Sequence, residues 1–195
     1  MNTARFPVRS LVLAALMAAV LCILGPLSVP VGPIPLSFAT LAIYFIAYLL
    51  GWKWGTASVL VYVLLGAVGL PVFSGCSGGM GKVLGPTGGY IVGYLFLAVI
   101  AGLVIQRTAN RFFQLLGMLA GTAVLYAFGT AWYCFQSGVA VGDALMKCVW
   151  IFIPGDLIKM AAALTVAAAA ASHGMSGCDH WSQHSRRPSG ENRGL

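Results

Sequence analysis

Apolar residues in this chain form long runs, separated by connections that are either short and polar or rich in proline and glycine. The runs do not alternate with polar residues, so they indicate helices rather than half-buried strands. A helix that crosses the hydrocarbon of a bilayer needs about 20 residues. The pattern predicts six membrane-spanning helices, over residues 10–25, 38–50, 56–70, 90–105, 112–135 and 144–172. The predicted fold is an all-α polytopic membrane protein.

The connections between these helices alternate in charge. One set comprises the start of the chain, the turns at 51–55 and 106–111, and the residues after 172, and it holds eight of the 11 Lys and Arg residues. The eight are Arg5, Arg9, Lys53, Arg107, Arg111, Arg186, Arg187 and Arg193. Basic loops stay on the cytoplasmic side of a membrane. We therefore predict an even number of spans with both termini cytoplasmic.

Composition supports this assignment and sets the domain boundaries. Hydrophobic residues make up 59% of the 195 residues and charged residues only 8%, against about 25% charged in soluble domains. A soluble enzyme, a disordered chain and a disulfide scaffold are excluded on this ground. We expect one six-helix membrane domain, residues 1–172, followed by a polar and disordered cytoplasmic tail, residues 173–195.

Signals for catalysis or metal binding are weak. Residues 75–79 match the GxSxG pattern around Ser77, but that motif needs a histidine base, and all three histidines lie in the predicted cytoplasmic tail. The five cysteines are scattered and contain no CxxC pair, so no metal site is predicted. The glycine-rich segment also lacks the GK[ST] ending of a phosphate-binding loop. The chain is not expected to be an enzyme or to carry a cofactor.

The last predicted span contains a charged pair in the segment IPGDLIK, residues 153–159. Ionisable side chains within a membrane span are costly and mark functional sites by default. Asp156 and Lys159 are three residues apart and so share one helix face. They could simply neutralise each other. Alternatively, they could form a polar ligand site next to a helix interruption at Pro154 and Gly155, suited to a small acid with a urea-like or amide head group.

The glycine-rich connection, residues 71–89, offers further candidates for a ligand site on the outer side. Lys82, Thr87 and Tyr90 supply polar groups, and glycines such as Gly79 and Gly88 allow a close approach of the backbone to a ligand. The alternative is that these glycines only make tight turns or helix contacts.

The first predicted span contains two overlapping pairs of small residues, Ala14 with Ala18 and Ala15 with Ala19. Small residues four apart let another helix approach closely. They serve either packing within this chain or docking on a separate membrane partner.

Three long segments resemble the BioY family, the biotin-binding S components of energy-coupling-factor (ECF) transporters. They are residues 29–51 (VPVGPIPLSFATLAIYFIAYLLG), 64–94 (LLGAVGLPVFSGCSGGMGKVLGPTGGYIVGY) and 153–159 (IPGDLIK). The resemblance extends over about residues 10–170, with the motifs in the same order as in the family.

The resemblance implies a function for each candidate. It implies six helices with biotin bound near the extracellular face, beneath the first loop and the glycine-rich connection. The IPGDLIK match implies ligand contacts for Asp156 and Lys159, with Lys159 compensating charge. The GPTGGY match implies ligand contacts for Thr87, Gly88 and Tyr90. We place Gly79 and Lys82 with them as further ligand-binding candidates, and the two alanine pairs resemble the surface that docks on the transmembrane ECF subunit.

The partners implied are biotin, the lipid bilayer, an EcfT-like transmembrane subunit and two ATPase subunits, since this chain contains no nucleotide-binding motif of its own. Two alternatives use the same site: a solitary biotin permease that works without ATPases, and an S component for another small vitamin. An intramembrane hydrolase using Ser77 is a more distant alternative.

Overall fold

The computed structural model describes residues 8–29, 35–108, 110–140, 142 and 152–172. The predicted cytoplasmic tail and the first part of the last predicted span, residues 144–151, lie outside these residues. The elements in chain order are α1 (Val8–Leu24), β1 (Ser28–Val29), β2 (Leu36–Ser37), α2 (Ala39–Val68), α3 (Met80–Val83), α4 (Gly88–Arg107), α5 (Arg111–Ser137) and α7 (Phe152–Ser172). The described part of the chain is thus mostly helical, as the apolar runs predict.

Three of the described helices, α2, α4 and α5, are long and apolar enough to cross a membrane, and α1 is a shorter apolar helix. The ends of α5 follow ordinary capping rules. Asn110 accepts a hydrogen bond from the backbone N–H of Phe112 at its start, and Gly138 adopts a left-handed φ of 65° just after its end. Helix α7 has 21 residues and carries the charged pair.

Helix α2 combines two of the predicted spans. The sequence predicts a five-residue turn at 51–55, but only Gly51 departs from helical geometry, with φ 70° and ψ −168°, and the helix continues on both sides of this kink. Left-handed φ values favour glycine, and a Cβ atom at Gly51 would overlap the side chain of Gln106 on α4. The break is therefore where the sequence places it, but it is a sharp kink instead of a turn.

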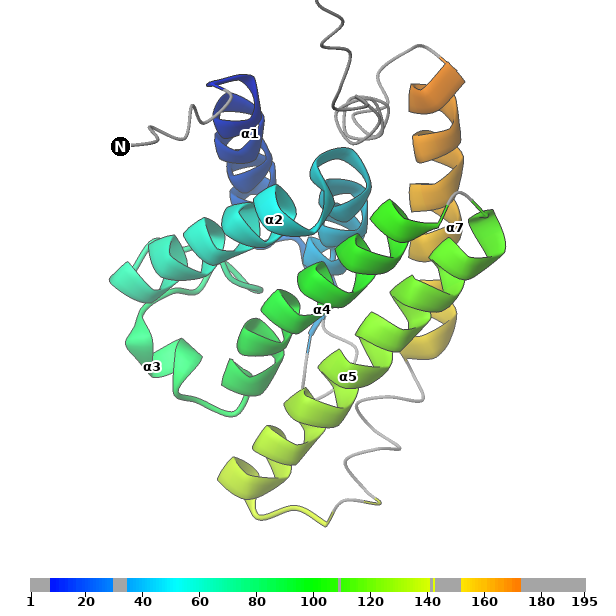
Figure 1. Ribbon diagram of the computed structural model, residues 1–195. Helices are drawn as coiled ribbons and strands as arrows, with labels where there is room; N and C mark the ends of the chain where they lie inside the picture. Colours follow the sequence, from blue (N-terminus) through cyan, green and yellow to red (C-terminus); the bar gives the residue numbers. More distant parts are fainter. Residues whose placement is uncertain (1–7, 30–34, 109, 141, 143–151, 173–195) are drawn as a thin grey trace, which may run out of the picture.

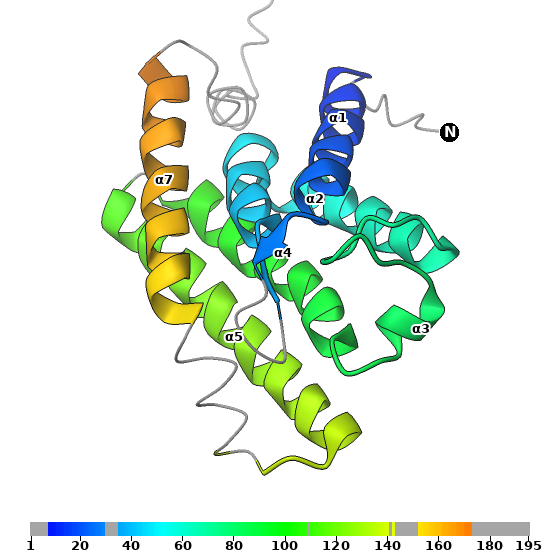
Figure 2. The same cartoon turned by 180° about the vertical axis from the view of Figure 1, so that it is seen from behind.

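The core lies where α4 packs between α2 and α5 (Figures 1 and 2). Helices α4 and α5 run side by side along most of their lengths, and glycines bring them close together. At Gly129 of α5, a side chain would overlap the ring of Tyr90 on α4. Helix α7 packs on α2 and α5 with one face: Asp156, Lys159, Met160 and Ala163 are buried, at the i, i+3, i+4 and i+7 spacing of a helix stripe.

The structure divides the four alanines of α1 into two pairs. Ala14 and Ala18 are buried, and Ser58 on α2 donates a hydrogen bond to the Ala14 carbonyl oxygen at 2.9 Å. Ala15 and Ala19 are exposed. The prediction that all four face a partner is therefore wrong for Ala14 and Ala18, because this pair packs α1 against α2.

The proline-rich and glycine-rich connections meet at one end of the helices. Strands β1 and β2 pair antiparallel, with Ser28 opposite Ser37. The backbone of the glycine-rich connection makes a tight reversal in which Phe73 pairs with Ser77, and the N–H of Gly75 donates to the Pro26 carbonyl oxygen at 3.2 Å. Ser77 lies within this reversal, where its hydroxyl donates to the Ser74 carbonyl oxygen at 2.8 Å.

The other end of the helices contains the α2 kink and the α4–α5 turn. The guanidinium of Arg111 lies over the ring of Tyr48, 5.9 Å from its centroid. Figure 1 shows the start of α1, the kinked region of α2, the α4–α5 turn and the end of α7 directed toward this same end.

The Gly51 kink can be tested against a glycine in the same helix. We expect Gly51→Ala to destabilise the protein by about 1–3 kcal/mol, because a side chain is strained at this φ and overlaps Gln106. Gly55→Ala is the matched control, since its Cβ would meet Ile46 only at 3.4 Å. Thermal unfolding in detergent should show a lower midpoint for Gly51→Ala alone; equal midpoints would contradict the account of the kink.

Candidate functional site

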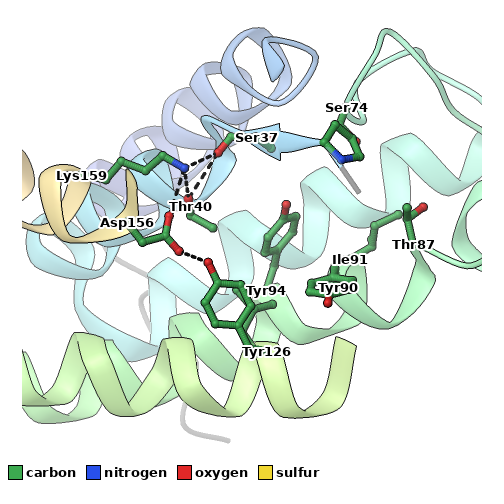
Figure 3. Close-up of a pocket in the computed structure, with 12 residues that line it drawn as sticks. Ser37, Thr40, Ser74, Thr87, Tyr90, Ile91, Tyr94, Tyr126, Asp156 and Lys159 are labelled. Atoms are coloured by element: carbon green, nitrogen blue, oxygen red, sulfur yellow. Dashed lines mark hydrogen bonds and ion pairs between the residues drawn. The ribbon is translucent and has the colours of Figure 1, made fainter. Parts of the chain in front are cut away.

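A cavity opens where β2, α2, the glycine-rich connection, α4, α5 and α7 converge (Figure 3). Among the described residues, its walls are mostly hydroxyl-bearing or aromatic side chains, with one pair of opposite charges. The lining residues are Pro35, Ser37, Thr40, Ser74, Thr87, Tyr90, Ile91, Tyr94, Leu125, Tyr126, Asp156 and Lys159. The cavity therefore combines polar ends with an apolar middle.

Lys159 lies at the centre of a hydrogen-bond network at one end of the cavity. Its Nζ lies 2.8 Å from the Ser37 carbonyl oxygen, 3.0 Å from the Thr40 Oγ1 and 3.1 Å from the Asp156 Oδ1. A lysine ammonium has three N–H donors, so these three acceptors use all of them. The residue is 7% exposed. Lys159 thus joins α7 to β2 and to the start of α2, and in this state it has no donor left for a ligand.

Asp156 is held from two sides. Its Oδ1 pairs with Lys159, and its Oδ2 accepts the hydroxyl hydrogen of Tyr126 from α5. The residue is only 3% exposed. A carboxylate can accept about four hydrogen bonds, so Asp156 keeps acceptor positions beyond the two that Lys159 and Tyr126 occupy. The charged end of the cavity therefore offers acceptors rather than donors.

Aromatic rings from α4 and α5 form the middle of the cavity. Thr87, Tyr90, Ile91 and Tyr94 follow the helical i, i+3, i+4, i+7 spacing, which brings all four to one face near the start of α4. The Tyr90 hydroxyl lies 3.0 Å from the Thr130 Oγ1, and its ring meets that of Tyr126 edge to face at 6.5 Å. Figure 3 shows Tyr90, Tyr94 and Tyr126 between the charged pair and the Ser74–Thr87 end.

The structure brings four of the predicted ligand-binding residues together. Asp156, Lys159, Thr87 and Tyr90 all line the cavity, although they come from segments about 70 residues apart in the chain. Pro154 and Gly155 lie in the first turn of α7. Both are part of the described helix, since proline is tolerated in a first turn. The predicted interruption of the span 144–172 stays a prediction, because residues 144–151 lie outside the described part of the chain.

Three other predicted ligand-binding residues do not line this cavity. Gly79 has a φ of 94° and its N–H donates to the Gly66 carbonyl oxygen at 2.7 Å. A Cβ at Gly88 would overlap the carbonyl oxygen of Val83. Lys82 lies in α3 and is partly exposed. The two glycines serve a turn and a close backbone packing, and a ligand role for any of the three stays a prediction.

Several lining residues were missed by sequence reasoning. Tyr94 follows Tyr90 by one helical turn, so the helical spacing could have indicated it. Ser37 and Thr40 flank the start of α2, a common place for hydroxyl residues. Tyr126 had no such signal, because its partner Asp156 lies 30 residues away on another helix.

Comparison with known proteins identifies the family. The sequence pattern of the BioY family matches residues 1–174, and the chain therefore belongs to the BioY family. It is 35% identical over 162 residues to the biotin transporter BioY of Thermotoga maritima, covering 82% of this chain and 94% of that protein. It is 37% identical over 163 residues to the biotin transporter BioY of Rhizobium etli, covering 77% and 87%.

A solved structure shares the fold. The S component for biotin from an ECF-type ABC transporter superposes with a TM-score of 0.78 at 33% sequence identity, covering 88% of this chain and 95% of that one. Together with the apolar helices, these relatives show that the chain is a membrane protein of a transporter family.

The energetic role of the charged pair can be tested without a ligand. We expect Lys159→Met to lower stability by about 3–5 kcal/mol, since it leaves Asp156 buried without its counter-charge. The double variant Lys159→Met/Asp156→Leu should recover a large part of this loss, because neither charge is then buried alone. Thermal unfolding of the ligand-free proteins in detergent measures both. A double variant less stable than Lys159→Met would contradict this account.

Proposed function

We propose that this protein captures biotin outside the cell and carries it across the cytoplasmic membrane as the substrate-specific S component of an ECF-type ABC transporter. The observation that carries the proposal is a cavity whose ends and middle suit the three parts of biotin. Biotin has a ureido group with N–H donors, an apolar bicyclic body and a carboxylate. Membership of the BioY family and the names of the relatives support the same substrate.

The donor and acceptor count favours one orientation of the ligand. Asp156 has acceptor positions to spare, whereas the three donors of Lys159 are all used by protein atoms. We therefore assign the ureido N–H groups to Asp156 and charge compensation to Lys159. The apolar bicycle then lies among Tyr90, Tyr94 and Tyr126.

The ligand carboxylate is assigned to the opposite end of the cavity, near Ser74 and Thr87. Both residues line the cavity and offer hydroxyl donors. Thr87 immediately precedes α4, a helix of 20 residues, and the start of a helix favours negative charge. This orientation leaves the Asp156–Lys159 pair intact and gives the ligand carboxylate hydroxyl donors near the start of α4.

The membrane topology proposed has six spans with both termini cytoplasmic. The spans are α1, the two parts of α2 on either side of Gly51, α4, α5 and α7. The convergence of the α2 kink and the α4–α5 turn at one end supports it, because Lys53, Arg107 and Arg111 belong to these segments. The loops that bound the cavity then face the outside.

The partners proposed are an EcfT-like transmembrane subunit and two ATPase subunits that supply the energy for release inside the cell. On α1, the exposed pair Ala15 and Ala19 remains available for a helix of the transmembrane subunit. Residues 173–195 are proposed to form a cytoplasmic tail outside the substrate-binding domain.

The site assignment predicts a loss of biotin affinity on substitution of either charged residue. We expect Asp156→Asn and Lys159→Ala each to weaken binding by more than about 1.4 kcal/mol, which is tenfold, because each leaves a buried partner unsatisfied. Titration of the purified proteins with biotin measures this, and Lys53→Ala is the control, because Lys53 follows the Gly51 kink of α2 and does not line the cavity. Unchanged affinity in both variants would show that the pair is purely structural.

The proposed substrate is tested by the same titration with other vitamins. Wild-type protein should bind biotin and desthiobiotin, which share the ureido group, and should not bind thiamine. If it binds thiamine and not biotin, the chain is an S component for another vitamin.

The need for partner subunits predicts the behaviour of reconstituted vesicles. Vesicles that contain this chain together with an ECF transmembrane subunit and ATPases should accumulate labelled biotin when ATP is supplied. Vesicles that contain the chain alone should bind biotin without accumulating it. Uptake by the chain alone would instead identify a solitary permease.

A further inference from the structure

Helix α5 places the phenol of Tyr126 against the carboxylate that we assign to the ureido group of biotin. The two residues are 30 positions apart and their side chains meet at the wall of the cavity. We propose that Tyr126 is a positioning residue for biotin recognition: it fixes the plane of the Asp156 carboxylate so that the remaining acceptor positions face the ligand. This inference rests on the proposed function.

The carboxylate needs a second contact to have a defined orientation. The terminal torsion of an aspartate is broad and roughly two-fold. Lys159 contacts only the Oδ1 atom, at 3.1 Å, and lies on the same helix three residues away. A single hydrogen bond leaves the carboxylate free to turn about that contact. The bond from Tyr126 to the Oδ2 atom comes from a different helix and removes this freedom.

Tyr126 can act in this way because its own ring is fixed. It meets the Tyr90 ring edge to face, with 6.5 Å between the centroids and an interplanar angle of 68°. The Tyr90 hydroxyl is in turn 3.0 Å from the Thr130 Oγ1 on α5, and the Tyr90 ring packs against Gly129. The phenol is therefore held by the α4–α5 contact, which belongs to the core of the fold.

The hydroxyl of Tyr126 is not the only tie between α5 and α7. An Arg111 guanidinium nitrogen donates to the Leu164 carbonyl oxygen at 3.2 Å, near the other end of the two helices. Lys159 independently joins α7 to β2 and α2. Removal of the hydroxyl should therefore leave the helices packed while the carboxylate loses its fixed plane.

The test compares ligands as well as variants. Tyr126→Phe removes only the hydroxyl, and we expect it to weaken biotin binding about tenfold, the effect of losing a hydrogen bond to a charged group. The probe ligand is biotin methylated on both ureido nitrogens, which lacks the N–H donors. The preference for biotin over this analogue should fall in Tyr126→Phe, whereas a merely structural role would weaken both ligands by the same factor.

Two further variants isolate the effect of the Tyr126 hydroxyl on biotin binding. Tyr44→Phe is the matched control, because the Tyr44 hydroxyl bonds Thr122 at 2.6 Å and does not line the cavity; it should keep the preference of the wild type. In an Asp156→Asn background, Tyr126→Phe should change biotin affinity by less than about threefold, since its action passes through the carboxylate.

The outcomes separate the inference from the proposed function. Wild-type protein that fails to bind biotin overturns the proposed function. Wild-type binding together with an unchanged ligand preference in Tyr126→Phe overturns the positioning role alone. Loss of the thermal transition in Tyr126→Phe also overturns it, because the hydroxyl would then be needed for the fold. A reduced preference with an unchanged unfolding midpoint supports it.

Discussion

The buried pair of Asp156 and Lys159 is the interaction on which the rest of the site depends. Two charges that are 3% and 7% exposed, in a chain whose surroundings are lipid and apolar side chains, are costly unless each is satisfied. The structure satisfies them with groups from several elements: a carbonyl oxygen of β2, a hydroxyl of α2 and a phenol of α5. The pair therefore fixes where α7 lies relative to α2 and α5.

The cavity forms beside this charged pair, between two loops on one side and aromatic rings on the other. The short β1–β2 pair and the reversal at Phe73–Ser77 lie against each other through the Gly75–Pro26 hydrogen bond. These loops bound the cavity on one side, and the rings of α4 and α5 bound it on the other. A pair of charges that only neutralised each other would need no cavity beside it. Here the pair is both a structural link and one wall of the cavity.

Sequence reasoning predicted the features that depend on local pattern. Apolar runs predicted the helices, and the three-residue spacing placed Asp156 and Lys159 on one face, as the 3.1 Å contact confirms. It could not show that Gly51 alone makes the break in α2, since Gln106, which crowds it, lies on another helix. It also could not separate Ala14 and Ala18 from Ala15 and Ala19, because only the position of α2 decides which pair is buried.

The hydrogen-bond partners of the charged pair could not be predicted from the sequence, for the same reason. Ser37, Thr40 and Tyr126 are ordinary hydroxyl residues in the sequence, and they become part of the site only when three helices converge. The family resemblance indicated the candidate residues in α7 and at the start of α4. It did not indicate the tyrosine of α5 that contacts the carboxylate. Long-range packing supplies what local pattern and motif cannot.

A structure of the protein with biotin bound is the sharpest test of the proposed site and ligand orientation. We expect a ureido nitrogen within hydrogen-bond distance, about 3 Å, of an Asp156 carboxylate oxygen. We also expect Lys159 to keep its contacts with Ser37 and Thr40, and the ligand carboxylate to lie near Ser74 and Thr87. A biotin carboxylate bound to a Lys159 that has left Ser37 and Thr40, or biotin bound away from this cavity, would contradict this assignment.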